Sequence, residues 1–479
     1  MLFSSIIFIF IFLPVFLGAY YLSGMRTAVL VTGSAVFYVW GEGAYIFLLL
    51  ALIAINFVAA RMLDRLQGRA RVLALTAAIV IDLGVLGLFK YTDFVVANLK
   101  MIFPALAMQP PGLKLPLGIS FFTFQLLSYL VDVYRRQVAS ESSLPRFATY
   151  ILMFPHLIAG PIVRYTEIRV ELAARRPALE RFGLGMQYFI VGLCQKVLIA
   201  NILAPVADHA FGLPAASLTA GDAATGIVAY SLQIYFDFCG YSNMAIGLAF
   251  MLGFTFPRNF DYPYAARSVT DFWRRWHMSL SFWFRDYVYI PLGGNQGGRA
   301  ATVRNLLIVF FLTGLWHGAA WNFVVWGLFH GGFLLAERMW LGKRLDHLPA
   351  VPRVVYTLLV VMIGWVFFRA PDLAHALRYL GAMVYPPHWG APGAGTRVLL
   401  SPEVIAAFAC GIVLAWPSLP GSLDRLGVRR MARSPGIREQ RMDTAHVHRL
   451  PIPVLLFGFA LATALLTGST LNPFLYFRF

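Results

Sequence analysis

His317 and His277 each lie in an apolar stretch of this chain, and imidazole is the side chain best suited to take up a proton near neutral pH. His317 stands in GLWHG at 314–318, and His277 stands in DFWRRWHMSLSF at 271–282. The glycines that flank Trp316-His317 allow another helix or a ligand to approach the backbone closely. An ionisable group at membrane depth is costly unless it is paired or functional. We interpret both histidines as candidate catalytic residues; the alternative is a buried histidine held by helix-packing contacts.

The segment around His277 has the periodicity of an amphipathic helix. Its apolar residues recur at i, i+3, i+4, i+7 and i+11, and Ser268 or Thr270 fits an N-cap. We therefore predict interfacial helices on the inner face of a membrane, with the imidazole on their apolar side. Arginines lie away from that side and favour an anionic donor, such as coenzyme A or an acylated carrier protein. The apolar positions are Trp273, Trp276, His277, Leu280 and Phe284, and the candidate donor-binding residues are Arg274, Arg275 and Arg285.

A third cluster of polar residues falls inside a long apolar run at 231–244. Asp237 can orient a histidine or a hydroxyl, or it can belong to a buried hydrogen-bond network between helices. Lys196 is a candidate countercharge for Asp237 or for Asp132. The candidate substrate-binding residues are Asp237, Tyr241, Trp276, Asn295 and Trp316.

Four glycines surround Asn295 and Gln296 and precede Arg299 and Arg304. Glycine-rich backbone with arginine can hold phosphate, although a flexible turn is the simpler interpretation.

The sequence has no zinc signature, no Ser-His-Asp motif and no dinucleotide fingerprint, so we expect no metal and no cofactor beyond the donor substrate.

The amino-acid composition indicates what kind of protein holds these residues in place. The 479 residues are 59% hydrophobic and 13% charged, with a mean hydropathy of +0.70. Soluble domains carry about 25% charged residues, so an ordinary soluble enzyme and a disordered chain are both excluded. Continuous rather than alternating apolar runs exclude a membrane β-barrel. We predict an all-α polytopic integral membrane protein.

Apolar runs long enough to span a bilayer recur along the whole chain. A further apolar segment at 148–163 is short and broken by Pro155 and Gly160-Pro161, which predicts a re-entrant segment. The twelve predicted crossings are 3–22, 27–40, 44–60, 72–89, 118–134, 184–203, 223–253, 304–318, 322–341, 353–369, 397–416 and 452–469.

The distribution of basic residues sets the predicted orientation. The net charge is +17, and most of the Lys and Arg fall in alternate loops, as expected on the cytoplasmic side. We therefore attribute the charge to topology and expect no nucleic-acid partner. Both termini are predicted to be periplasmic, and the basic loop at about 423–449 is predicted to be cytoplasmic and flexible. No internal repeat or interdomain linker is evident, so residues 1–479 are taken as one domain with a catalytic core at about 116–345.

Seven segments spread from one end of the chain to the other carry a resemblance to a known family. They are the opening LFSSIIFIFIFLPVFLGAYYL, PLGISFFTFQLLSYLVDVYR at 116–135, FPHLIAGPIVRY at 154–165, QIYFDFCGYSNMAIGLAFMLGF at 233–254, NFDYPYAARSVTDFWRRWHMSLSFWFRDYVYIPLGGN at 259–295, GLWHGAAWNFVVWGLFHG at 314–331 and the ending NPFLYFRF. In these segments the chain resembles the membrane-bound O-acyltransferase family and, within it, the alginate O-acetyltransferase group. It departs from the group at Asn243, where aspartate is expected in many members.

The resemblance implies a fold and an activity. The family's invariant histidine corresponds to His317, and a second family histidine corresponds to His277. The implied fold is a ring of about twelve transmembrane helices, with re-entrant and interfacial helices, around a central tunnel. The implied donor is acetyl-CoA, and a periplasmic partner of the SGNH type completes transfer to a secreted polysaccharide. Phe474, Tyr476 and Phe479 reproduce an F-x-Y-x-x-F pattern of related D-alanylation systems, which makes Tyr476 a third candidate catalytic residue.

The predicted function is therefore acetyl transfer across a bacterial inner membrane, for O-acetylation of alginate or a cellulose-like exopolysaccharide by a synthesis and secretion complex. Peptidoglycan O-acetylation and D-alanyl transfer are alternatives with the same chemistry. A transporter or flippase, or a structural scaffold, is an alternative of a different class. Whether His317 is a base or a transient acyl carrier stays open.

Overall fold

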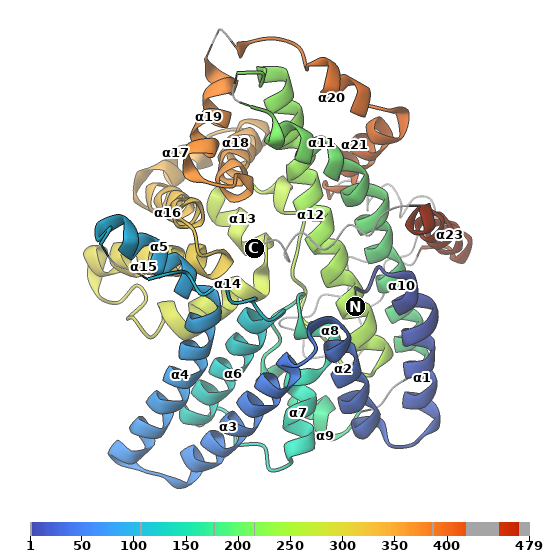
Figure 1. The fold of residues 1–479 in the computed structure, drawn as a ribbon, viewed down its shortest axis with the longest axis vertical. Helices are drawn as coiled ribbons and strands as arrows, with labels where there is room; N and C mark the ends of the chain where they lie inside the picture. The colour runs from blue at the N-terminus through green and yellow to red at the C-terminus, as the bar shows by residue number, and fades with distance from the viewer. Residues whose placement is uncertain are drawn as a thin grey trace. The chain divides into compact units, whose positions relative to one another are not determined.

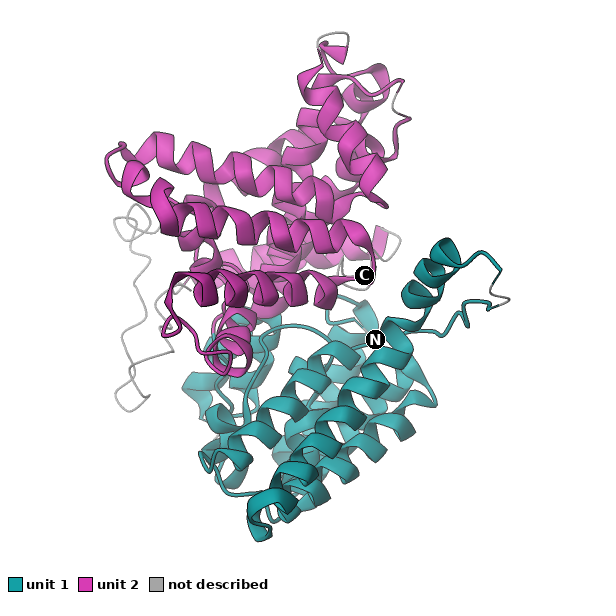
Figure 2. Cartoon of the chain, turned by 90° about the vertical axis from the view of Figure 1, so that its left-hand side faces the viewer, with its two compact units in different colours: residues 1–189, 244–257 teal, residues 190–243, 258–479 magenta. Residues whose placement is uncertain are grey.

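The computed structural model describes residues 2–105, 108–175, 178–214, 216–385, 388–417 and 450–468, and these form helices and connecting loops with no strand among them (Figure 1). The all-α prediction is confirmed for this part of the chain. The predicted cytoplasmic loop at 423–449 and Tyr476 lie outside the described residues. The chain divides into two compact units, residues 1–189 with 244–257 and residues 190–243 with 258–479 (Figure 2).

The first unit is built around α6, whose sixteen residues are almost all buried. Helices α3 and α4 pack against it, and α7 packs on α2 and α3. Its helices are η1 (Phe8–Phe12), α1 (Leu13–Leu22), α2 (Arg26–Glu42), α3 (Tyr45–Arg65), α4 (Gly68–Lys90), α5 (Thr92–Ile102), α6 (Ile119–Tyr134), α7 (Leu144–Leu152), α8 (Phe154–Leu157), α9 (Tyr165–Ala173), the first part of α10 (Leu179–Cys194) and the end of α12 (Ala220–Met251).

The apolar segment predicted to be broken at 148–163 is broken and buried in the first unit. Helix α7 ends at Leu152, and no helix forms between Ile158 and Arg164. Its freed polar groups find partners within the unit: the Tyr150 hydroxyl donates to the Val163 carbonyl at 3.2 Å, and the amide of Phe154 donates to a serine hydroxyl at 3.2 Å. Irregular backbone of this kind is tolerated at membrane depth only where protein or a water cavity satisfies it.

The second unit contains both predicted catalytic histidines. Its helices are the end of α10, η2 (Gln195–Ala200), α11 (Asn201–Gly212), most of α12 (Ala220–Met251), η3 (Pro263–Ala265), α13 (Val269–Arg275), α14 (Met278–Phe284), η4 (Arg285–Tyr289), α15 (Gly298–His317), α16 (Trp321–Ala336), η5 (Glu337–Leu341), α17 (Gly342–Asp346), α18 (Ala350–Arg369), α19 (Leu373–Val384), α20 (Ala394–Leu399), α21 (Pro402–Leu414) and α23 (Ile452–Gly468).

Helices α15 and α16 pack closely because glycines lie at their contact. A Cβ atom at Gly314 would overlap the carbonyl oxygen of Phe323, and one at Gly327 would overlap the carbonyl oxygen of Phe310. The prediction that a helix approaches the backbone beside His317 is confirmed. This packing fixes the end of α15, where His317 stands.

Each predicted crossing overlaps a helix, and five helical segments among the described residues are long and apolar enough to span a membrane. The other predicted crossings fall on helices that do not meet both criteria, so the twelve-span count stays a prediction. The five segments are Tyr45–Arg65, Gly68–Lys90, Leu179–Gly212, Gly298–His317 and Ala350–Arg369.

Candidate active site

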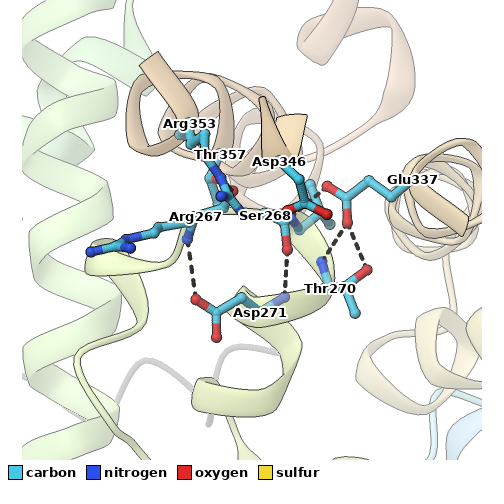
Figure 3. Close-up of polar contacts among 9 residues, drawn as sticks. Arg267, Ser268, Thr270, Asp271, Glu337, Asp346, Arg353 and Thr357 are labelled. Atoms are coloured by element: carbon cyan, nitrogen blue, oxygen red, sulfur yellow. Dashed lines mark hydrogen bonds and ion pairs between the residues drawn. The ribbon is translucent and has the colours of Figure 1, made fainter. Parts of the chain in front are cut away.

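The short helix α13 is held at its start by a buried carboxylate. The Ser268 hydroxyl accepts a hydrogen bond from the Asp271 amide at 3.0 Å. Of the two N-cap candidates in the sequence, Ser268 and Thr270, the N-cap is therefore Ser268. The Glu337 carboxylate accepts from the amides of Val269 and Thr270 at 2.7 and 2.9 Å, and from the Thr270 hydroxyl at 2.6 Å (Figure 3). A carboxylate at a helix N-terminus is favoured by the helix dipole and by charge-assisted hydrogen bonds. Glu337 therefore fixes the helix that leads to His277.

The single helical face predicted through His277 is wrong, because the helix is interrupted there. Helix α13 ends at Arg275, Trp276 is extended, and His277 has φ +43° before α14 begins. A positive φ is uncommon outside glycine, and here neighbouring chain holds it. The amide of Asp261 donates to the Arg275 carbonyl at 2.9 Å, and the amide of Met278 donates to the Asn259 carbonyl at 3.0 Å. These bonds come from a segment distant in sequence, so periodicity alone could not reveal the break.

His277 is fully buried at this break. Its Nδ1 lies 3.1 Å from Oδ1 of Asn259, and its ring meets the Phe238 ring edge-on at 4.7 Å. Burial lowers the pKa of His277 to about 3, so its imidazole is neutral at pH 7.

His317 ends α15 and is 4% exposed. Its ring lies 4.9 Å from the Trp316 ring, 4.9 Å from Trp326 and 5.2 Å from Phe368. The Trp316 ring also lies 6.0 Å from His277. The structure therefore brings His277, Trp316 and His317 together around one indole, in surroundings made mainly of aromatic rings.

The second unit has a third buried histidine, His330 of α16, which was not selected from the sequence. It is fully buried, and its ring lies 5.3 Å from both Trp273 and Trp326. Trp326 thus contacts both His317 and His330. The signal was present in GLFHG at 327–331, but this histidine lies in an apolar run without a polar neighbour, and nothing in its spacing set it apart.

Asp237 forms a buried ion pair with Lys196 at 2.5 Å, so the predicted pairing is confirmed for Asp237. Their side chains are 3% and 4% exposed. The helices approach closely here, since a Cβ at Gly240 would lie 2.6 Å from the Gly192 carbonyl. Tyr241, which lies one turn after Asp237 along α12, is also buried. The network interpretation accounts for Asp237 as observed, and its predicted substrate role stays a prediction.

The remaining candidate residues lie in different surroundings. Trp276 is buried against rings that include Phe260 and Trp365, at 5.0 and 4.8 Å, whereas Asn295 is exposed and accepts from the Tyr289 hydroxyl. The glycine-rich turn is tied down by Asn305, whose Nδ2 donates to two of its carbonyls at 3.1 and 3.0 Å.

The predicted donor-binding arginines differ in how far they are engaged. Arg274 is exposed and has no ion-pair partner within the described ranges. Arg275 pairs with Asp271 at 2.8 Å, and Arg285 pairs with its neighbour Asp286 at 2.6 Å. Within those same ranges no group of three or more His, Cys, Asp and Glu could hold a metal ion.

Comparison with known proteins gives a consistent result. The sequence model of the membrane-bound O-acyltransferase family (MBOAT) matches residues 16–374. The probable alginate O-acetylase AlgI of Azotobacter vinelandii is 40% identical over 100% of both chains. The peptidoglycan O-acetyltransferase of Helicobacter pylori is 37% identical over 80% of each chain, and the teichoic acid D-alanyltransferase of Streptococcus thermophilus is 30% identical over 48% of this chain and 58% of its own. With a family match across most of its length, and with buried histidines meeting at Trp316, the chain belongs to the membrane-bound O-acyltransferase family and is an O-acyltransferase.

Proposed function

We propose that this O-acyltransferase moves acetyl groups from cytoplasmic acetyl-CoA across the inner membrane for O-acetylation of a secreted polysaccharide. The observation that carries the proposal is the meeting of His277 and His317 at Trp316, in a chain similar over its full length to a probable alginate O-acetylase. An alginate or cellulose-like glycan is the proposed acceptor, within a synthesis and secretion complex.

In the proposed reaction, His317 acts as the general base. It takes the proton of the acceptor hydroxyl, and the oxygen forms a bond to the thioester carbonyl carbon. The carbon–sulfur bond breaks, and the imidazolium returns the proton to the departing thiolate, which leaves an ester and free coenzyme A. The His317 ring is buried among aromatic side chains, and general-base catalysis typically contributes about 10²–10⁴-fold.

The donor site is proposed on the cytoplasmic side, at the arginines of α13 and η4. Arg274 is the strongest candidate among them because it is exposed and, within the described ranges, unpaired by any acidic residue. A guanidinium group recognises phosphate through charge-assisted hydrogen bonds, which suits coenzyme A.

The first acceptor is proposed to be the Tyr476 hydroxyl. With both termini periplasmic, the tail would carry acetyl-tyrosine to the serine of a periplasmic SGNH-type acetyltransferase. A phenol has an unperturbed pKa of about 10, so it needs a base such as His317 to attack. Its ester is more reactive than that of an ordinary alcohol, which favours onward transfer.

The test is His317→Ala, with His347→Ala as the matched control because His347 is exposed. Acetyl content of the secreted polysaccharide is expected to fall below detection in His317→Ala, at normal membrane levels of the protein, and to stay unchanged in the control. Normal acetylation in His317→Ala would refute the base role and would favour a scaffold.

Peptidoglycan is the second candidate acceptor, favoured by the 37% identity to the Helicobacter pylori relative over 80% of the chain. Acetyl analysis of both the exopolysaccharide and the cell wall in the same strains separates the two. If His317→Ala loses acetyl groups from the cell wall but not from the exopolysaccharide, peptidoglycan is the acceptor.

A further inference from the structure

Asn259 lies in the non-helical segment between α12 and η3 and is buried. Its Oδ1 accepts from the backbone amide of Ser279 at 3.3 Å and from the Ser279 hydroxyl at 2.9 Å. A backbone N–H can only donate, so the atom facing it must be the amide oxygen. This fixes the orientation of the Asn259 side chain, and its Nδ2 then donates to the Ser242 hydroxyl of α12 at 3.2 Å.

The orientation of Asn259 determines which nitrogen of His277 carries the proton. His277 Nδ1 lies 3.1 Å from the same Oδ1, which cannot donate, so Nδ1 must be the donor. A neutral imidazole has one N–H, and the lone pair is therefore on Nε2. Nε2 is buried and has no hydrogen-bond partner in the part of the chain that the structure describes.

We propose that Asn259 is a positioning residue that holds His277 in the tautomer whose Nε2 accepts a hydrogen bond, and that Nε2 accepts it from a hydroxyl or amide N–H group of the bound substrates other than the hydroxyl that His317 deprotonates. The proposal rests on the proposed acyl transfer. The attacking hydroxyl has one proton, which goes to His317, and a neutral imidazole in this tautomer cannot donate to the thioester carbonyl oxygen. His277 is thereby assigned to orienting the bound substrates rather than to stabilising charge on the acyl group.

The same asparagine also fixes the backbone of His277. Its carbonyl oxygen accepts from the Met278 amide at 3.0 Å, directly after the residue with positive φ. Asn259 therefore sets both where the imidazole lies and which nitrogen is free, a role comparable to the groups that orient a catalytic histidine in other enzymes.

Asn259→Asp separates this role from simple packing. The carboxylate can accept from His277 Nδ1, from Ser279 and from the Ser242 hydroxyl, so every hydrogen bond has a counterpart. Its negative charge favours the imidazolium and raises the pKa of His277. The active neutral form is then lost at higher pH, and the acid limb of the kcat profile should move up by about 1 pH unit or more.

Asn259→Leu removes the acceptor and should lower kcat by about 10²-fold or more. The matched control is Ser281→Ala, which removes one side-chain bond of α14, to the Trp273 carbonyl, outside this network. The control should keep both kcat and the acid limb. An acid limb in Asn259→Asp that coincides with that of the unmodified protein would overturn the proposal.

A measurement independent of turnover uses protein labelled with ¹⁵N in the histidine rings and reconstituted in bilayers. Comparing the ¹⁵N spectra of the unmodified protein and of His277→Asn identifies the two ring signals of His277. These should be one protonated Nδ1 and one unprotonated Nε2. In Asn259→Leu, part of the His277 population should instead carry its proton on Nε2. A protonated Nε2 in the unmodified protein would overturn the tautomer assignment whatever the activity. Full acetylation by His277→Ala with the expected spectrum would instead refute the role of His277 in transfer while leaving the assignment intact.

Discussion

The buried pair Lys196–Asp237 is the clearest test of how the second unit is held together. Its charges lie 2.5 Å apart, with side chains 4% and 3% exposed, and it joins η2 to α12. Replacing Lys196 by Met leaves Asp237 as an uncompensated buried charge, and replacing Asp237 by Leu leaves Lys196 in the same state.

Each single variant should lose about 3–5 kcal/mol of unfolding free energy, the usual cost of breaking a buried pair. The double variant Lys196→Met/Asp237→Leu should recover most of that loss, because well-packed apolar residues often replace a buried pair at little or no cost. The exposed pair Arg353–Asp346 gives the control: its nitrogen and oxygen lie 2.9 Å apart, but the aspartate is 71% exposed. Breaking it should cost about 0–1 kcal/mol.

Unfolding of the purified protein by SDS in mixed micelles gives the four free energies of the double-mutant cycle. If the loss of unfolding free energy in the double variant equals the sum of the losses in the two single variants, the coupling between Lys196 and Asp237 is refuted. The double variant also tests the predicted substrate role of Asp237. If it is stable and acetylates normally, Asp237 is structural, whereas a raised KM for the acceptor in a stable double variant would support substrate binding.

Three further predictions follow from single contacts and from the proposed roles. Gly314→Ala should lower the free energy of unfolding by about 1–3 kcal/mol, because the added methyl group would overlap a carbonyl oxygen of α16. Gly332→Ala is the control: a Cβ there meets nothing within 4 Å, so thermal unfolding should show no comparable loss of stability. Arg274→Gln and Arg285→Gln should each raise the KM for acetyl-CoA more than they lower kcat, as initial rates can show, and unchanged KM values would move the donor site elsewhere. Tyr476→Phe should abolish polysaccharide acetylation at normal membrane levels, and full acetyl content would leave the tail only an anchoring role.

Features encoded by local pattern were predictable from the sequence. The apolar runs gave the positions of the helices, and the glycines beside His317 indicated the close approach of α16. Pro155 and Gly160 marked the broken segment, and an unbalanced aspartate in an apolar run pointed to Lys196.

Features that depend on distant contacts were not predictable. The break at His277 is held by Asn259, and α13 is capped by Glu337, which is 67 residues from Thr270. Glu337 had no pattern around it that predicts a partner, and His330 is set apart only by its burial between two tryptophans. Such contacts arise from the tertiary packing of helices whose order along the chain does not reveal their neighbours.

The central claim is that this protein itself takes an acetyl group from acetyl-CoA through chemistry that depends on His317. The direct measurement supplies acetyl-¹⁴C-labelled coenzyme A to the purified protein in proteoliposomes, together with a polysaccharide acceptor and the periplasmic partner. The account predicts labelled ester, on the protein or on the glycan, that is absent with His317→Ala and present with His347→Ala. Equal labelling with His317→Ala, or no release of coenzyme A from the unmodified protein, would contradict it.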